Sequence, residues 1–190
     1  VVNRSTAQAQ GRGSWQSLTN QQLAQAAECN VAGQVVINPV TRLAKITVEV
    51  YYTANSAEAT NYLTIYMLQD SIWGSQGGGS SNPEQYVNGN YCHMHILRDA
   101  ITADWGDEIA PTTAGTLITK EYVYEIPASI GSPNGVEVDL ENIAFLAFVE
   151  EKQQGATYRP ILNVNELTVT QGTEEAIYPI IANVAAASGI

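Results

Sequence analysis

The sequence predicts a mainly β protein: an antiparallel β-sandwich of the jelly-roll or immunoglobulin-like type, with one short N-terminal helix. Short apolar runs alternate with polar residues at a period of two, which is the pattern of half-buried strands. Turn-forming residues separate these runs. Hydrophobic residues make up 45% and charged residues 14% of the 190, which is the composition of a chain that builds a core.

The N-terminal part differs in pattern from the rest of the chain. We expect residues 1–30 to form a segment with one helix and residues 31–190 to form the β-sandwich domain. The Ala- and Gln-rich stretch 20–28 favours a helix. Thr19 would cap this helix, because Gln22 follows three residues later as a capping box requires.

The strands follow from the period-two runs after residue 30. In the run 43–53, Ile46, Val48 and Val50 fall on one side, so this side should face the core. We expect strands over 34–39, 43–53, 62–70, 91–99, 118–127, 142–152 and 159–172, with loops at 74–85 and 101–116 and turns at 132–135 and 153–156.

Charge and hydropathy exclude two classes of partner. Lys and Arg number 8 against 19 acidic residues, a formal net charge of -11. Such a surface repels nucleic-acid phosphates, and anionic lipid headgroups for the same reason, so no nucleic-acid partner is expected. No apolar run approaches the roughly 18 residues that a membrane-spanning helix needs.

Both histidines lie in the stretch "YCHMHILRD" at 91–99. In a strand, His93 and His95 would project side by side, and Asp70 is one carboxylate that could complete a metal site or a metal-dependent hydrolase site. The alternative is structural: the histidines bond to neighbouring segments and Arg98 pairs with a carboxylate, with Asp70 as the candidate. We assign no catalytic residue and no cofactor.

Other polar and aromatic residues have binding or structural interpretations. Trp73 and Trp105 could form part of a binding face for a protein or a carbohydrate, or they could cover the core. The acidic loop that contains Asp104, Asp107 and Glu108 is expected to be solvated, with calcium binding as the alternative. Glu150 and Glu151 are expected to form a solvated strand end.

Neither the two cysteines nor any catalytic motif that we searched for in the sequence indicates a reaction. Cys29 and Cys92 could pair or stay free, and no C-x-x-C is present. The chain has no G-x-S-x-G elbow. The glycine-rich stretch "GSQGGGSS" lacks the G-K-[ST] ending of a phosphate-binding loop.

The stretch "LTIYMLQDSIWGSQ", the Gly/Ser loop after it and "YCHMHILR" resemble the outer membrane protein 28 family of secreted lipoproteins. The resemblance covers about 44–170. The family pattern has an acid, a glutamine and an H-N-H-V-L-R stretch. The matching residues in this sequence are Asp70, Gln76, His93, His95, Leu97 and Arg98. The sequence departs from the pattern at Gln69 before the acid, at Met94 between the histidines and at Ile96, which stands in place of Val.

The resemblance implies an extracytoplasmic location, at the outer membrane or cell surface of a Gram-negative bacterium. A lipid anchor outside this chain would then be the membrane contact. It also implies an upstream thioredoxin-like domain, of which "VVNR" and a helix over 15–28 would be the remnant. We therefore expect a non-enzymatic module that binds or assembles with an unidentified protein or carbohydrate, and Gln76 joins Trp73 and Trp105 as a candidate binding residue. The alternative hypothesis is that the chain is an accessory domain of a thioredoxin-like redox protein.

Overall fold

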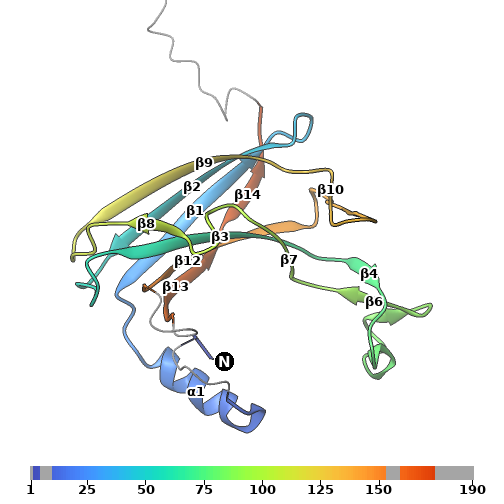
Figure 1. Cartoon of the computed structure of the whole chain (residues 1–190), viewed down its shortest axis with the longest axis horizontal. Coiled ribbons are helices and arrows are strands. Elements are labelled where there is room, and N and C mark those ends of the chain that lie inside the picture. Colours follow the sequence, from blue (N-terminus) through green and yellow to red (C-terminus); the bar gives the residue numbers. More distant parts are fainter. Residues whose placement is uncertain (1, 5–9, 153–158, 174–190) are drawn as a thin grey trace, which may run out of the picture.

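Two β-sheets face each other in the computed structural model, which describes residues 2–4, 10–152 and 159–173 (Figure 1). The four-stranded sheet has the order β14 (Thr168–Gln171), β1 (Cys29–Ile37), β2 (Leu43–Tyr52), β9 (Leu117–Glu125). The five-stranded sheet consists of β13 (Ile161–Glu166), β12 (Ile143–Glu150), β3 (Asn61–Gln69) and β7 (Ile96–Ala100), and β8 (Asp107–Ile109) also pairs with β3. The predicted mainly β sandwich is confirmed.

The inward faces of the two sheets form one core. On β2, Ile46, Val48, Val50 and Tyr52 are all fully buried, as the alternation predicts. They pack in one cluster with side chains from β1, β3 and β12. Phe145, the third residue of β12, has no exposed surface. Burial of these apolar side chains is the main force that holds the sheets together.

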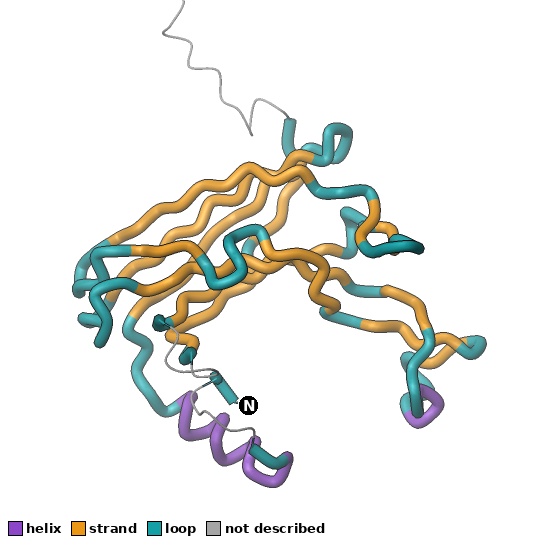
Figure 2. The backbone as a smooth tube through the Cα atoms, in the orientation of Figure 1, coloured by secondary structure: helices purple, strands orange, loops and turns teal. Residues whose placement is uncertain are grey.

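A small three-stranded sheet projects from one end of the sandwich (Figure 2). Its strands, in the order β4-β6-β5, are β4 (Ile72–Gly74), β6 (Asn90–His93) and β5 (Tyr86–Val87), and the 3₁₀-helix η2 (Gly79–Ser81) lies between β4 and β5. We call this unit, residues 72–93, the projecting sheet. A hairpin of β10 (Ser129–Ile130) and β11 (Val136–Glu137) surrounds the predicted turn at 132–135.

The last described strands depart from the predicted single run at 159–172. The run divides at Leu167, which is buried and donates its N–H to the Phe145 carbonyl at 2.8 Å. The chain thereby changes sheets, because β13 pairs with β12 whereas β14 pairs with β1. The β1–β14 pairing is parallel, which local alternation cannot indicate.

The predicted helix bounds and cap are wrong. The 3₁₀-turn η1 (Arg12–Ser14) leads into helix α1 (Trp15–Leu23), so Thr19 lies inside the helix, and Ser14 at the cap position makes no side-chain capping bond. The chain leaves the helix before residue 28 because the Glu28 carbonyl accepts N–H groups from the turn after β2, at 2.9 and 3.1 Å. Here a tertiary contact overrides alanine propensity.

The outcomes of the remaining predictions differ from segment to segment. The predicted loop at 101–116 contains the short strand β8, which pairs with the start of β3. The predicted turn at 153–156 lies outside the described residues. The division at residue 30 stays a prediction. Among the described helices, none is long and apolar enough to cross a membrane.

Candidate functional site

The histidine stretch is not one strand. β6 ends at His93 and β7 begins at Ile96, and the two strands belong to different sheets. His95 lies between them with a φ of 54°, a left-handed conformation that ends the alternation. The prediction that His93 and His95 project side by side from one strand is therefore wrong.

The two imidazoles have separate surroundings. The His93 ring lies against Tyr91, with ring centroids 5.0 Å apart. His95 Nδ1 lies 3.6 Å from Asp70 Oδ1, and the same oxygen accepts the His95 backbone N–H at 2.5 Å. In the part of the chain that the structure describes, no three His, Cys, Asp or Glu side chains lie close enough to hold one ion. The metal-binding hypothesis for these residues stays a prediction.

Among the described residues, Arg98 pairs with no carboxylate, contrary to the expectation. Its guanidinium donates to the Gln69 side-chain oxygen and to the backbone carbonyls of Val136, at 2.8 Å, and Glu137, at 3.3 Å. Burial lowers the pKa of Arg98. The side chain therefore ties β11 to the end of β3, and Asp70 is left to hold the backbone of His95.

One face of the projecting sheet is exposed and apolar. Trp73 pairs with Cys92 across β4 and β6, and Val87 pairs with Asn90 across β5 and β6, so these side chains share a face. Trp73 is 55% exposed, Val87 47% and Met94, just beyond β6, 41%. We call Trp73, Val87, Cys92 and Met94 the apolar face. Such a grouping on so small a unit is typical of a contact surface.

The opposite face of the projecting sheet is covered. Gly79 of η2 sits against Tyr86 and Tyr91, so close that an added Cβ would lie 2.8 Å from the Tyr86 ring. His93 extends over Gly74 on this side, with its Nε2 3.7 Å from the position of a Cβ there. The strand alternation thus separates a packed face from the bare face that carries Trp73.

The structure brings together only part of the predicted binding set. Trp73 and the exposed Gln76 both lie in the projecting sheet, after the end of β3. Trp105 precedes β8, which pairs with the start of β3. Nine residues of strand, about 30 Å, separate these two ends. Trp73 and Trp105 therefore cannot form one platform.

The exposed Trp105 lies instead beside a buried charge cluster that sequence reasoning missed. Glu150 has 2% of its surface exposed and pairs with Arg159 at 2.9 Å and with Arg4 at 2.6 Å. The Thr64 hydroxyl donates to the same carboxylate at 2.8 Å. Arg159 also donates to the Trp105 carbonyl. The expectation that Glu150 is a solvated strand end is wrong, because two arginines neutralise it.

The predicted acidic loop keeps its carboxylates apart. Asp104 is exposed, Asp107 accepts the Ala103 N–H at 3.3 Å, and Glu108 accepts the Tyr62 hydroxyl at 3.2 Å. Both bonds are structural: the Asp107 bond is local, and the Glu108 bond reaches across to β3. Calcium binding at this loop stays an untested alternative.

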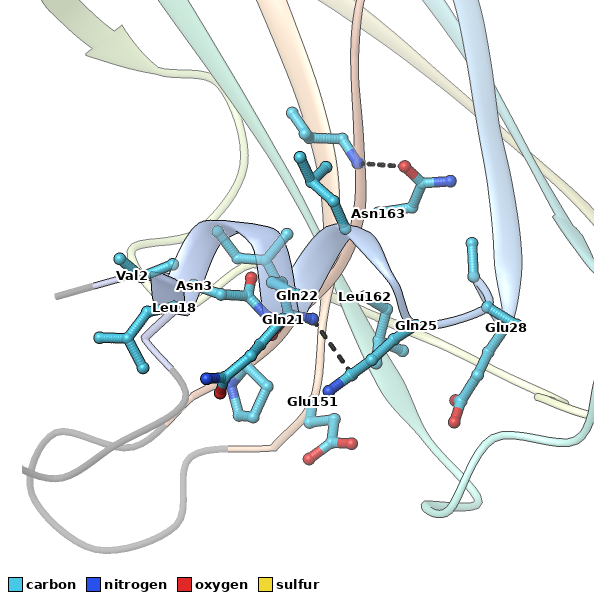
Figure 3. A pocket seen from close by; sticks show the side chains of 16 residues that line it. Val2, Asn3, Leu18, Gln21, Gln22, Gln25, Glu28, Glu151, Leu162 and Asn163 are labelled. Carbon is cyan, nitrogen blue, oxygen red and sulfur yellow. Dashed lines mark hydrogen bonds between the residues drawn. The ribbon is translucent and has the colours of Figure 1, made fainter. Parts of the chain in front are cut away.

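A concave surface lies between α1 and β13 (Figure 3). It is a cavity of about 600 Å³, lined on the helix side by glutamine, leucine and alanine side chains, and Glu28 and Glu151 also line it. Burial raises the pKa of Glu151, and the negative charges of Glu28 and Glu58 add to the rise. This arrangement would attract cationic groups, yet no described side chain marks a reaction there.

The two cysteines are both free. Cys29 is fully buried at the start of β1, and burial raises the pKa of its thiol to about 12, which makes it inert. Cys92 is partly exposed on the apolar face. The two thiols thus have different surroundings, and only Cys92 is accessible to a reagent or a ligand.

Comparison with known proteins gives a fold and a family. HBP35 of Porphyromonas gingivalis is similar in structure, with a TM-score of 0.61 and 16% sequence identity, over 81% of this chain and 45% of that one. A domain of the outer membrane lipoprotein Omp28 from Porphyromonas gingivalis aligns with a TM-score of 0.48 and 17% identity, over 78% of this chain and 93% of that one. The chain thus spans less than half of the length of HBP35, and no curated protein matches its sequence.

The family match covers nearly the whole chain. The family described as "Outer membrane protein Omp28" matches residues 1–172. This confirms the expected location at the outer membrane or cell surface of a Gram-negative bacterium. The chain, a mainly β sandwich with a projecting sheet, belongs to the Omp28 family of outer membrane proteins.

Proposed function

We propose that this chain is a non-enzymatic binding module of an outer-membrane lipoprotein, and that the apolar face of the projecting sheet holds a protein partner. The observation that carries the proposal is the exposure of Trp73, Val87 and Met94 on one face of a sheet whose other face is packed. An unpaired apolar face on an outlying unit costs solubility, and a partner that covers it would remove that cost.

The chemistry of the face favours a protein over a carbohydrate. Trp and Met are enriched at protein interfaces, where a Trp in a desolvated pocket often contributes most of the binding energy. A sugar site needs several polar groups around a flat ring. Around Trp73, the neighbours on the same face are Val87, Cys92 and Met94, and Asn90, opposite Val87, is the polar side chain that the strand register places on this face.

The net charge indicates the kind of protein. A chain with a formal charge of -11 attracts basic surfaces over long range and repels acidic ones. The partner we propose therefore presents an apolar anchor that is flanked by Lys or Arg. The alternative is a carbohydrate ligand, which the experiment below distinguishes from a protein partner.

Anchoring and domain order remain part of the same proposal. We infer a lipid anchor outside this chain and a thioredoxin-like domain before it, so that the sandwich carries the binding face away from the membrane. The family resemblance supports this inference. In this arrangement the chain is an accessory to the preceding domain.

The test is a selection of displayed peptides on the purified chain, with a glycan array probed in parallel. Selected peptides should share an apolar residue beside basic ones, and Trp73→Ala should weaken their binding by about 2 kcal/mol or more. Trp105→Ala is the matched control, because Trp105 is also exposed, 62% against 55%, at the other end of β3. Equal losses in the two variants, or binding of glycans alone, would contradict the proposal.

A further inference from the structure

Two sulfur atoms lie side by side on the apolar face. Cys92 Sγ and Met94 Sδ are 3.9 Å apart. If an ion is bonded to both sulfurs at about 2.3 Å, a typical metal–thiolate distance, this separation gives a sulfur–metal–sulfur angle of about 116°. That angle is close to the trigonal value, so one ion could bridge both atoms without movement of the backbone.

The donor types select the kind of ion. Thiolate and thioether sulfur are soft ligands, which favour Cu(I) over hard cations. Zinc sites instead use four ligands drawn from Cys, His and carboxylates, or three with an open position, and no such group of three exists among the described residues. The site is also accessible, since Met94 is 41% exposed and Cys92 is partly exposed.

A third feature of the face suits a soft cation. Trp73 stands directly opposite Cys92 on the neighbouring strand, so its side chain projects from the same face of the sheet as the Cys92 sulfur. A cation near the face of an indole ring is attracted by the ring's negative charge. His93 is not part of this arrangement, because it projects to the packed face over Gly74.

We propose that Cys92 and Met94 form a binding site for a soft monovalent cation of the Cu(I) or Ag(I) class, beside Trp73. Binding forms one bond from the ion to the Cys92 sulfur and releases the thiol proton to water, while the Met94 thioether donates a lone pair. No electron is transferred. The site uses the proposed partner face but needs no partner, so the two proposals can fail independently.

The experiment is a titration of the reduced chain, without an affinity tag, with Ag(I) in chloride-free buffer. Native mass spectrometry should show one ion per chain, and indole fluorescence should fall upon binding. The same measurement with Cu(I), under anaerobic conditions and against a competing Cu(I) chelator, should give the same stoichiometry. Trp73→Phe should retain the ion and lose the change in fluorescence.

Sulfur variants separate a built site from a single reactive thiol. Cys92→Ser should abolish binding, and Met94→Leu, which keeps the side-chain volume, should weaken it by about tenfold or more. Cys29→Ser is the matched control and should bind like the wild type, because Cys29 is fully buried. Equal affinity of Met94→Leu and wild type would show binding by one thiol alone and overturn the proposal. Retention of the ion by Cys92→Ser, or displacement of Ag(I) by Zn²⁺, would also overturn it.

Discussion

Arg159 and Glu150 form an ion pair of 2.9 Å in which neither side chain has more than 4% of its surface exposed. Burial lowers the pKa of Arg159, and the negative charge of Glu150 opposes this shift. The Arg159 guanidinium also lies 4.9 Å from the centre of the Tyr62 ring. The pair connects the end of β12 to the chain just before β13, so it fixes that end of the five-stranded sheet.

Loss of the Glu150 charge should destabilise the fold strongly. In Glu150→Gln, the Arg159 charge stays buried without a counter-charge, which typically costs about 3–5 kcal/mol. The free energy of unfolding, measured with denaturant, should fall by that order. Glu121→Gln is the control, because Glu121 pairs with Lys45 at the same distance of 2.9 Å but is 56% exposed. That variant should lose less than about 1 kcal/mol, and equal losses would contradict the argument.

The burial of Glu150 shows which features of the fold a sequence can predict. Apolar alternation depends on neighbouring residues, so the core face of β2 was predictable. The partners of Glu150 lie nine positions along the chain, at Arg159, and 146 positions away, at Arg4. A strand that ends in "EEK" looks solvated until those partners are known.

The break between strands at His95 also depends on a residue that is distant in the sequence. Period two continues through residues 91–99, so the sequence predicts one strand. The chain turns because the Asp70 carboxylate accepts the backbone N–H of His95. The apolar face was predictable only in part: Trp73 follows from its position before the glycines, whereas its register with Cys92 depends on how β4 and β6 pair.

Arg98 should hold the β10–β11 hairpin in place. Arg98→Ala removes the bonds to the carbonyls of Val136 and Glu137 and leaves those groups to water. Amide hydrogen exchange over 129–137 should accelerate, because the local opening becomes easier. Arg98→Lys should recover only part of the protection, since one ammonium cannot reproduce the guanidinium fork. Unchanged exchange in Arg98→Ala would show that the hairpin is held by other contacts.

Glu151 should make stability depend on pH. Its pKa is raised in the folded state, so the folded chain holds the proton more tightly than the unfolded chain. Wild type therefore loses stability relative to Glu151→Gln as the pH rises through the glutamate range. Thermal unfolding should show a higher melting temperature for Glu151→Gln at pH 7 and no difference well below its ordinary pKa of 4.5.

A second variant tests the cause of that shift. Burial is its largest cause, and the charge of Glu28 comes next. In a Glu28→Gln background, the gain from Glu151→Gln should shrink but persist. Complete loss of the gain would make charge repulsion, and not burial, the dominant cause.

Gly33 should tolerate no larger residue, because β1 and β2 approach each other closely at this point. A Cβ there would overlap the Thr47 carbonyl oxygen and lie 3.1 Å from the Leu167 side chain. The overlap is with backbone, so relief requires the two strands to separate. Gly33→Ala should therefore lower the free energy of unfolding by about 1–3 kcal/mol, measured with denaturant.

Gly13 provides the comparison for this substitution. A Cβ at Gly13 would meet nothing within 4 Å, so Gly13→Ala should change the free energy of unfolding by less than about 0.5 kcal/mol. Because Gly33 directly precedes Gln34, which pairs with Thr168, and an added Cβ would crowd Leu167, its substitution should also disturb the parallel β1–β14 pairing. Exchange at 168–171 should then accelerate more than at 117–125. A neutral Gly33→Ala would mean that the strands have room for a methyl group, and the close approach would not hold.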